Sequence, residues 1–184
     1  WYDPSAASGS LDWRRNLLQY TESFASNDWN YLRISAVLST VKPDDVLGST
    51  LFTPNSVYNA HNLEIALVTG NRYTVSIYAK SNGYNYLGIS NAGSSANTTT
   101  FNLSTGQVHN TGADIDSAVM LDVGNGWYRC SMTWSAPYNS IRFYIASTSQ
   151  FNNYYSGDGT SGMYFTGAQL EEASTASSYQ PILS

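Results

Sequence analysis

The sequence feature that most constrains the fold is the turn Gly124-Asn125-Gly126, which leads directly into residues 126–134. An Asn-Gly pair favours a two-residue hairpin turn because both residues tolerate a positive φ. Successive side chains of a strand point to opposite faces, so the segment that follows sorts into two sets. The set expected in the core is Tyr128, Cys130 and Met132, and the set expected outside is Trp127, Arg129 and Ser131.

The same alternation recurs along most of the chain, with turn residues between the segments. The clearest expected strands are 72–80, 84–90, 126–134, 141–147 and 163–171, and the weaker ones are 31–38, 63–68, 98–103 and 115–123. Residues 42–62 are expected to form a long loop with one short strand at 49–52. So many strands without helices need two sheets, so we predict an all-β fold, an antiparallel β-sandwich with jelly-roll topology.

Length and composition indicate one folded domain. The chain has 184 residues, enough for a well-buried core, and 14% of them are aromatic while only 11% are charged. This composition excludes disorder, which needs few aromatics and much charge. We expect an irregular N-terminal arm or linker over residues 1–15 and a single β-sandwich domain over residues 16–184.

Charge and cysteine content exclude several classes of partner and site. The net charge of −5 disfavours nucleic acid, and the sequence lacks the run of about 18 apolar residues that membrane insertion needs. Cys130 is the only cysteine, so no internal disulfide can form, and its place on the core face predicts an inert buried thiol.

Outward positions of four strands carry aromatic or cationic side chains. If these strands share a sheet, the side chains form one exposed platform, for which aromatic stacking on sugar rings is a suitable use. Arginine donors would bind hydroxyls, carboxylates or sulfates, and so favour acidic sugars. The alternative is that loops, the N-terminal arm or a neighbouring subunit cover these residues. The candidate ligand-binding residues are Tyr78, Tyr86, Trp127, Arg129, Arg142 and Tyr144.

Catalytic signatures are missing from the sequence, so we predict that the domain is not an enzyme. His61 and His109 have no metal-ligand spacing, and no nucleophile elbow, phosphate loop or dinucleotide fingerprint occurs. His109 is expected on the surface and His61 in the long loop. Glu64 could reach an exposed face, but its spacing indicates no partner carboxylate.

A structural calcium ion is the one cofactor that we consider, and none is otherwise required. Calcium prefers carboxylate and carbonyl oxygens, which loops between strands supply. Glu22 near the start and Gln169 or Glu171 on the last strand would meet where the two ends of a jelly roll adjoin. The alternative is that these are ordinary polar surface residues.

Several segments in series resemble a module that recurs in tailed-phage virion proteins. The matching segments are 14–18, 20–24, Trp29, 73–80, 124–131, 157–162, 167–171 and 178–181. The resemblance implies a jelly-roll, carbohydrate-binding-like domain of phage tail or fibre proteins and of some bacterial surface or polysaccharide-degrading proteins. In similar modules the N-terminal segment and the last strand can share a calcium ion, which implies Glu22 and Gln169 as ligands.

These observations lead to three functional hypotheses. The first is a non-catalytic carbohydrate-binding module that recognises a cell-surface or extracellular polysaccharide within a phage adsorption protein, on the virion or outside the cell. The second is a structural virion assembly or decoration domain that contacts protein neighbours, including further copies of itself. The third is a polysaccharide-degrading enzyme domain.

Overall fold

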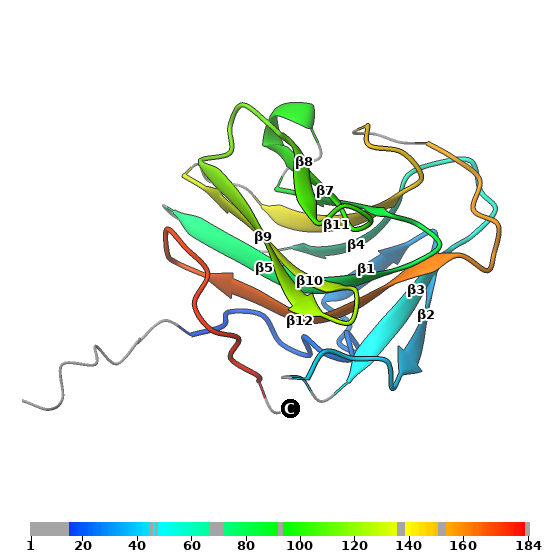
Figure 1. Ribbon diagram of the computed structural model, residues 1–184, viewed down its shortest axis with the longest axis horizontal. Coiled ribbons are helices and arrows are strands. Elements are labelled where there is room, and N and C mark those ends of the chain that lie inside the picture. The colour runs from blue at the N-terminus through cyan, green and yellow to red at the C-terminus, as the bar shows by residue number, and fades with distance from the viewer. Residues whose placement is uncertain are drawn as a thin grey trace, which may run out of the picture.

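The protein is an antiparallel β-sandwich, as expected (Figure 1). The computed structural model describes residues 15–44, 46, 48–66, 72–91, 94–135, 139–150 and 154–182, so all but the last residue of the arm expected over residues 1–15 lies outside the described residues. In the described part, the two sheets have six strands each, and the only helical element is the 3₁₀ turn Ser95–Asn97. No helix in this described part is long and apolar enough to cross a bilayer. The prediction of an all-β jelly-roll sandwich is confirmed.

Each sheet draws its strands from distant parts of the chain. Sheet A contains, in spatial order, β1 (Trp29–Leu32), β4 (His61–Ala66), β11 (Ser140–Ala146), β6 (Tyr86–Ser90), β7 (Thr98–Asn102) and β8 (Gln107–Thr111). Sheet B contains β2 (Ile34–Ser39), β3 (Ser49–Pro54), β12 (Gly162–Glu171), β5 (Tyr73–Asn82), β10 (Trp127–Trp134) and β9 (Ser117–Gly124). In Figure 1, sheet A lies above sheet B.

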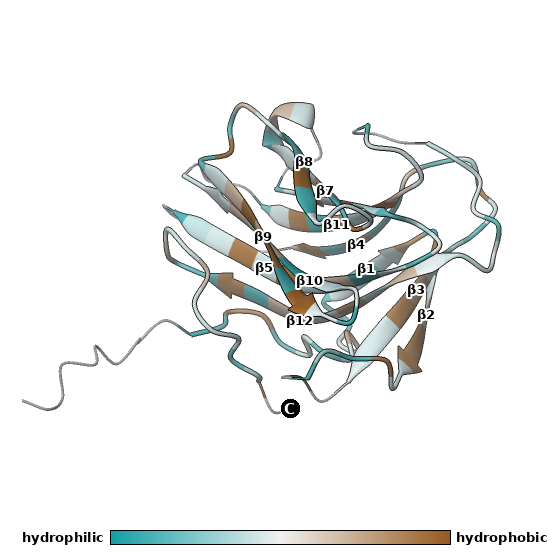
Figure 2. Ribbon diagram, viewed as in Figure 1, coloured by the Kyte–Doolittle hydropathy of each residue, from teal (hydrophilic) through white to brown (hydrophobic). Residues whose placement is uncertain are grey.

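The core lies between the two sheets and follows the expected alternation. On β5, Val75 and Ile77 are fully buried, and on β10, Cys130 and Met132 are fully buried. The alternation of apolar and polar residues along these strands is visible in Figure 2. The prediction that the Cys130 thiol is buried is confirmed, and this burial raises its pKa far above the ordinary value, which disfavours the reactive thiolate.

The Asn-Gly turn joins β9 and β10 as predicted, with a φ of 55° at Asn125 and 76° at Gly126. Other local predictions were wrong in detail. The expected strand at 31–38 is two strands, β1 and β2, which lie in different sheets because Arg33 takes a φ of 60° between them. The polar strand β8 was not expected, because its residues show no apolar alternation.

The two ends of the domain lie side by side, as expected for a jelly roll. The Asn16 side chain donates to the carbonyl of Ala168 at 2.9 Å and accepts from the amide of Leu170 at 3.1 Å. The amide of Leu17 donates to the carbonyl of Leu170 at 2.9 Å. The N-terminal segment therefore lies along the second half of β12, after a bulge at Gly167.

Candidate functional site

The structure divides the predicted platform between the outer faces of the two sheets, which point in opposite directions. The residues on sheet B are Tyr78, Trp127 and Arg129, and the residues on sheet A are Tyr86, Arg142 and Tyr144. The expectation of a single platform was therefore wrong. Its physical reason is the jelly-roll connection: β5 and β6 follow each other in the chain, but the short segment between them carries the chain from one sheet to the other.

A C-terminal strap, residues 172–182, covers the sheet B half (Figure 1). Trp127 is 1% exposed and Tyr78 is 5% exposed, and both pack with Val46 in a small second core. The ring of Tyr179 contacts the ring of Tyr78 edge to face, with 5.8 Å between centroids. The prediction that Trp127 and Tyr78 are exposed was wrong, because alternation identifies the outer face of a strand but not what lies over it.

Arg129 holds this strap in place. Its Nη1 donates to the carbonyl of Ser177 at 2.6 Å, and its Nη2 donates to the hydroxyl of Ser76 at 2.9 Å. The guanidinium carbon lies 5.5 Å from the centre of the Tyr78 ring. On its other side Arg129 lines a hollow of about 220 Å³ between β9, β10 and the strap. Arg129 thus binds the chain itself through Nη1 and Nη2, whereas its buried Nε has no hydrogen-bond partner in the structure.

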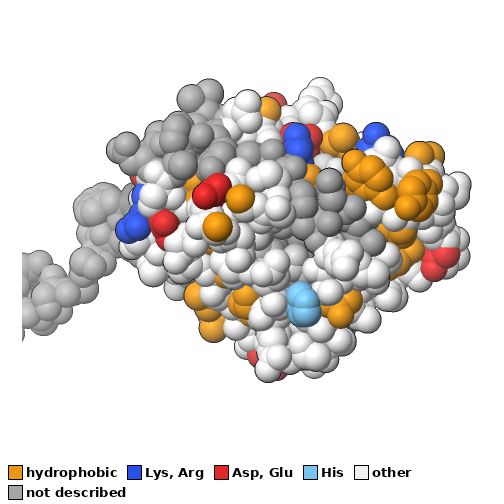
Figure 3. All heavy atoms as spheres, turned by 90° about the horizontal axis from the view of Figure 1, so that it is seen from above, with side chains coloured by type: hydrophobic (Ala, Val, Ile, Leu, Met, Phe, Trp, Pro, Cys, Tyr) orange, Lys and Arg blue, Asp and Glu red, His pale blue; other side chains and the backbone are white. Residues whose placement is uncertain are grey.

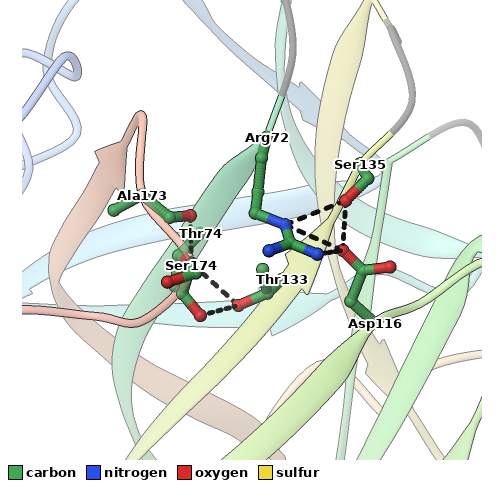
Figure 4. A network of polar contacts seen from close by, with 7 residues as sticks. All are labelled: Arg72, Thr74, Asp116, Thr133, Ser135, Ala173 and Ser174. Carbon is green, nitrogen blue, oxygen red and sulfur yellow. Dashed lines mark hydrogen bonds and ion pairs between the residues drawn. The ribbon is translucent and has the colours of Figure 1, made fainter.

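Hydroxyl groups on the outer face of sheet B bind the beginning of the strap (Figure 4). The Thr74 hydroxyl donates to the carbonyl of Ala173 at 2.9 Å, and Thr133 donates to the carbonyl of Ser174 at 3.5 Å. The two threonine hydroxyls lie 2.8 Å apart. The strap therefore uses the polar groups that an open face would offer to a ligand.

The side chains expected to bind calcium make hydrogen bonds within the protein. The side-chain oxygen of Gln169 accepts from the amide of Gln180 at 2.7 Å, and its Nε2 donates to Glu171 at 2.8 Å. Glu22 Oε1 accepts from the hydroxyl of Tyr179 at 3.1 Å. Calcium takes about six to eight oxygen ligands. No group of three or more His, Cys, Asp or Glu residues among the described residues could hold a metal ion, and calcium stays an untested prediction.

The outer face of sheet A brings the other three predicted residues together. In the strand register, Tyr144 lies between Asn62 on β4 and Gly88 on β6, two residues along β11 from Arg142. Tyr86 lies further along β6. Its ring contacts that of the exposed His109, with 5.9 Å between centroids.

An ion pair occupies the centre of this face. Arg142 Nε donates to Glu64 Oε1 at 2.9 Å, and the two side chains are 31% and 17% exposed. Burial favours a lower pKa for Arg142, but hydrogen bonds with Tyr144 and Glu64 outweigh it and raise the pKa. Burial raises the pKa of Tyr144, which keeps its hydroxyl neutral. The sequence had indicated no partner for Glu64; the register supplies Arg142 directly opposite.

Close packing at Gly88 helps to position the Tyr144 side chain. A Cβ atom at residue 88 would lie 3.2 Å from the Tyr144 Cβ and 3.6 Å from Cδ2 of its ring. Asn62 on β4 lies beside Tyr144, and its side-chain amide nitrogen is buried and has no hydrogen-bond partner in the structure. The absence of a side chain at Gly88 therefore leaves room for Tyr144 against β6.

Sequence reasoning missed two aromatic residues near this face. Tyr58 is 68% exposed and Tyr154 is 48% exposed, and their rings meet edge to face with 6.5 Å between centroids. Tyr154 lies close enough to Tyr144 to contribute to raising its pKa. Their position in loops rich in Asn and Ser was the available signal, because exposed aromatics in such loops are unusual unless they contact something.

Carboxylates are sparse on the strands of sheet A. Its six strands contain a single carboxylate, Glu64, which is paired with Arg142, whereas a glycosidase ordinarily needs two carboxylates. His61 is fully buried, and its two ring nitrogens lie 2.8 and 3.0 Å from carbonyl oxygens. Seen from above, the described residues on this side show scattered charged side chains and a group of hydrophobic ones toward the right edge (Figure 3).

Three solved structures illustrate what this chain is similar to. One match is a crystal structure of the enzymatically active domain of tailspike protein 4 from bacteriophage CBA120, with a TM-score of 0.51 and 14% sequence identity. The match covers 84% of this chain and 21% of the tailspike chain. A family 29 carbohydrate-binding module matches with a TM-score of 0.40 and 11% identity, over 83% and 86% of the two chains.

The carbohydrate-binding and catalytic modules of xylanase 10B from Clostridium thermocellum, complexed with xylohexaose, match with a TM-score of 0.43 and 15% identity, over 85% and 27%. No protein family model matches the sequence, and no curated protein matches it. The tailspike likeness supports the jelly-roll architecture that the sequence predicts.

Proposed function

We propose that the protein is a non-catalytic carbohydrate-binding domain that takes a polysaccharide on the outer face of sheet A. The observation that carries this proposal is the juxtaposition of Tyr144 with the Glu64–Arg142 ion pair. An aromatic ring stacks on the apolar face of a sugar, while a guanidinium and a carboxylate bind its hydroxyls. Tyr86, Tyr58 and Tyr154 supply further aromatic surface on the same side.

We place this domain in a phage tail protein that adsorbs to a cell-surface polysaccharide. This setting is supported by the likeness of fold to a bacteriophage tailspike and by the sequence segments that resemble virion modules. The whole tailspike is much longer than this chain, so its activity is not transferred here. A domain that binds sugar without cutting it would hold the virion at the cell surface while other parts of the particle act.

The test is the Tyr144→Ala variant in affinity gel electrophoresis against a panel of neutral and acidic polysaccharides. Losing one stacked ring removes about 1.5–3 kcal/mol of burial, so retention should weaken roughly tenfold to a hundredfold. Tyr164→Ala is the matched control, because Tyr164 is another half-buried tyrosine but lies on sheet B. If the wild type binds polysaccharide and Tyr144→Ala binds it equally well, sheet A is not the site.

A second candidate function is protein contact within a virion. The observation that favours it is an apolar stripe on the edge strand β9, where Val119 is 46%, Leu121 54% and Val123 38% exposed. Exposed apolar stripes of this kind are typical of protein interfaces. Multi-angle light scattering separates the two functions: a stable oligomer that Leu121→Lys dissociates favours assembly, and a monomer favours ligand binding.

A further inference from the structure

The charges on the sheet A face cancel each other at its centre. Among the residues of the six strands, Arg142 is the only Lys or Arg and Glu64 is the only Asp or Glu. The two are joined at 2.9 Å, and both are largely screened from solvent. The two histidines of these strands differ in exposure, because His109 on β8 is exposed and His61 on β4 is fully buried.

This arrangement removes the basis for acidic-sugar recognition. A guanidinium selects a carboxylate or sulfate when its own charge is uncompensated. Arg129 binds the strap on the opposite sheet, and Arg142 already has an anionic partner. A uronate or sulfate brought to Arg142 would lie beside Glu64, and this like-charge approach is unfavourable.

The same pair is well suited to uncharged sugars. A hydroxyl both donates and accepts, and the ion pair presents N–H donors beside carboxylate acceptors. We propose, resting on the function proposed above, that the sheet A site is selective for neutral polysaccharides and that Glu64 sets this selectivity by neutralising Arg142. Glu64 is then the residue that excludes acidic glycans, while Tyr144 supplies sugar stacking to either class.

The test compares Glu64→Gln with the wild type on a neutral polymer, a glucomannan, and an acidic one, a polyuronate. Glutamine keeps the shape of the side chain but leaves the Arg142 charge uncompensated. Glu172→Gln is the matched control, because it changes net charge equally at an exposed position on the strap. The measurements are made at pH 8. Circular dichroism and the melting temperature confirm that each variant is folded.

We expect the wild type to bind the neutral polymer and not the polyuronate. Glu64→Gln should gain about tenfold in retention on the polyuronate, an effect that salt at about 1 M suppresses, and Glu172→Gln should not. The double variant Glu64→Gln/Arg142→Gln should lose that gain, because it removes the uncompensated charge.

Wild-type binding to the polyuronate, or no gain in Glu64→Gln, would overturn the selectivity while leaving carbohydrate binding intact. Binding to no polymer of either class by the wild type would overturn both proposals.

Discussion

Replacing Trp127 with alanine tests whether this residue stabilises the fold or binds a ligand. The indole is 1% exposed and packs with Tyr78 and Val46 beneath the C-terminal strap. A buried tryptophan removes roughly 150–250 Å² from water, worth about 4–6 kcal/mol at about 25 cal/mol per Å². Residual compactness of the unfolded chain reduces this to about 3–5 kcal/mol, the usual range for Trp→Ala. We therefore expect Trp127→Ala to lower the free energy of unfolding by that amount.

Urea denaturation followed by fluorescence and circular dichroism measures this loss. At about 2–4 °C per kcal/mol for a chain of this size, the melting temperature should fall by roughly 10 °C. Trp127→Phe is the conservative control and should retain most of the stability, because an aromatic ring still fills the site. The folded alanine variant should bind polysaccharide as the wild type does. A loss below about 1 kcal/mol, or a folded variant that no longer binds, would refute the assignment of Trp127 to the second core.

Two further predictions concern pH and metal ions. Hydrogen bonds from the Ser161 hydroxyl and from the amides of Thr160 and Ser161 lower the pKa of Asp158. The Asp158 carboxylate therefore stabilises the fold above the unfolded pKa of about 3.9, and this stabilisation is lost as pH falls through the lower pKa of the folded state. The melting temperature of the wild type should therefore fall more steeply between pH 5 and pH 2 than that of Asp158→Asn, and parallel profiles would contradict this. The side-chain oxygens of Glu22 and Gln169 accept hydrogen bonds from protein donors, so EDTA should leave the melting temperature unchanged. If EDTA lowers the melting temperature and added calcium restores it, calcium binding is supported instead.

Local patterns predicted much of the sandwich because strand alternation and turn chemistry act over a few residues. The Asn125-Gly126 turn, the buried set of β5 and the buried Cys130 all follow from period-two alternation and from a tolerance of positive φ. The break at Arg33 could not be predicted, because a non-glycine residue takes positive φ there only under the constraint of the two sheets on either side.

The candidate site was predictable residue by residue but not as a set. Alternation placed Tyr86, Arg142 and Tyr144 outward, and it placed Trp127 and Arg129 outward by the same rule. Which outward faces remain open depends on contacts between residues far apart in sequence. One example is the hydrogen bond from Arg129 to the carbonyl of Ser177, which lies 48 residues further along the chain.

The sequence by itself determined the fold class and, for the strands with clear alternation, which side chains point outward, because both depend on neighbouring residues along one chain. The tertiary structure alone decided which strands share a sheet, that the C-terminal strap covers sheet B, and that Glu64 meets Arg142 across 78 residues. These outcomes depend on strand register and on competition for buried surface, which are properties of the assembled sandwich. The carbohydrate site proposed for sheet A therefore depends on the tertiary structure.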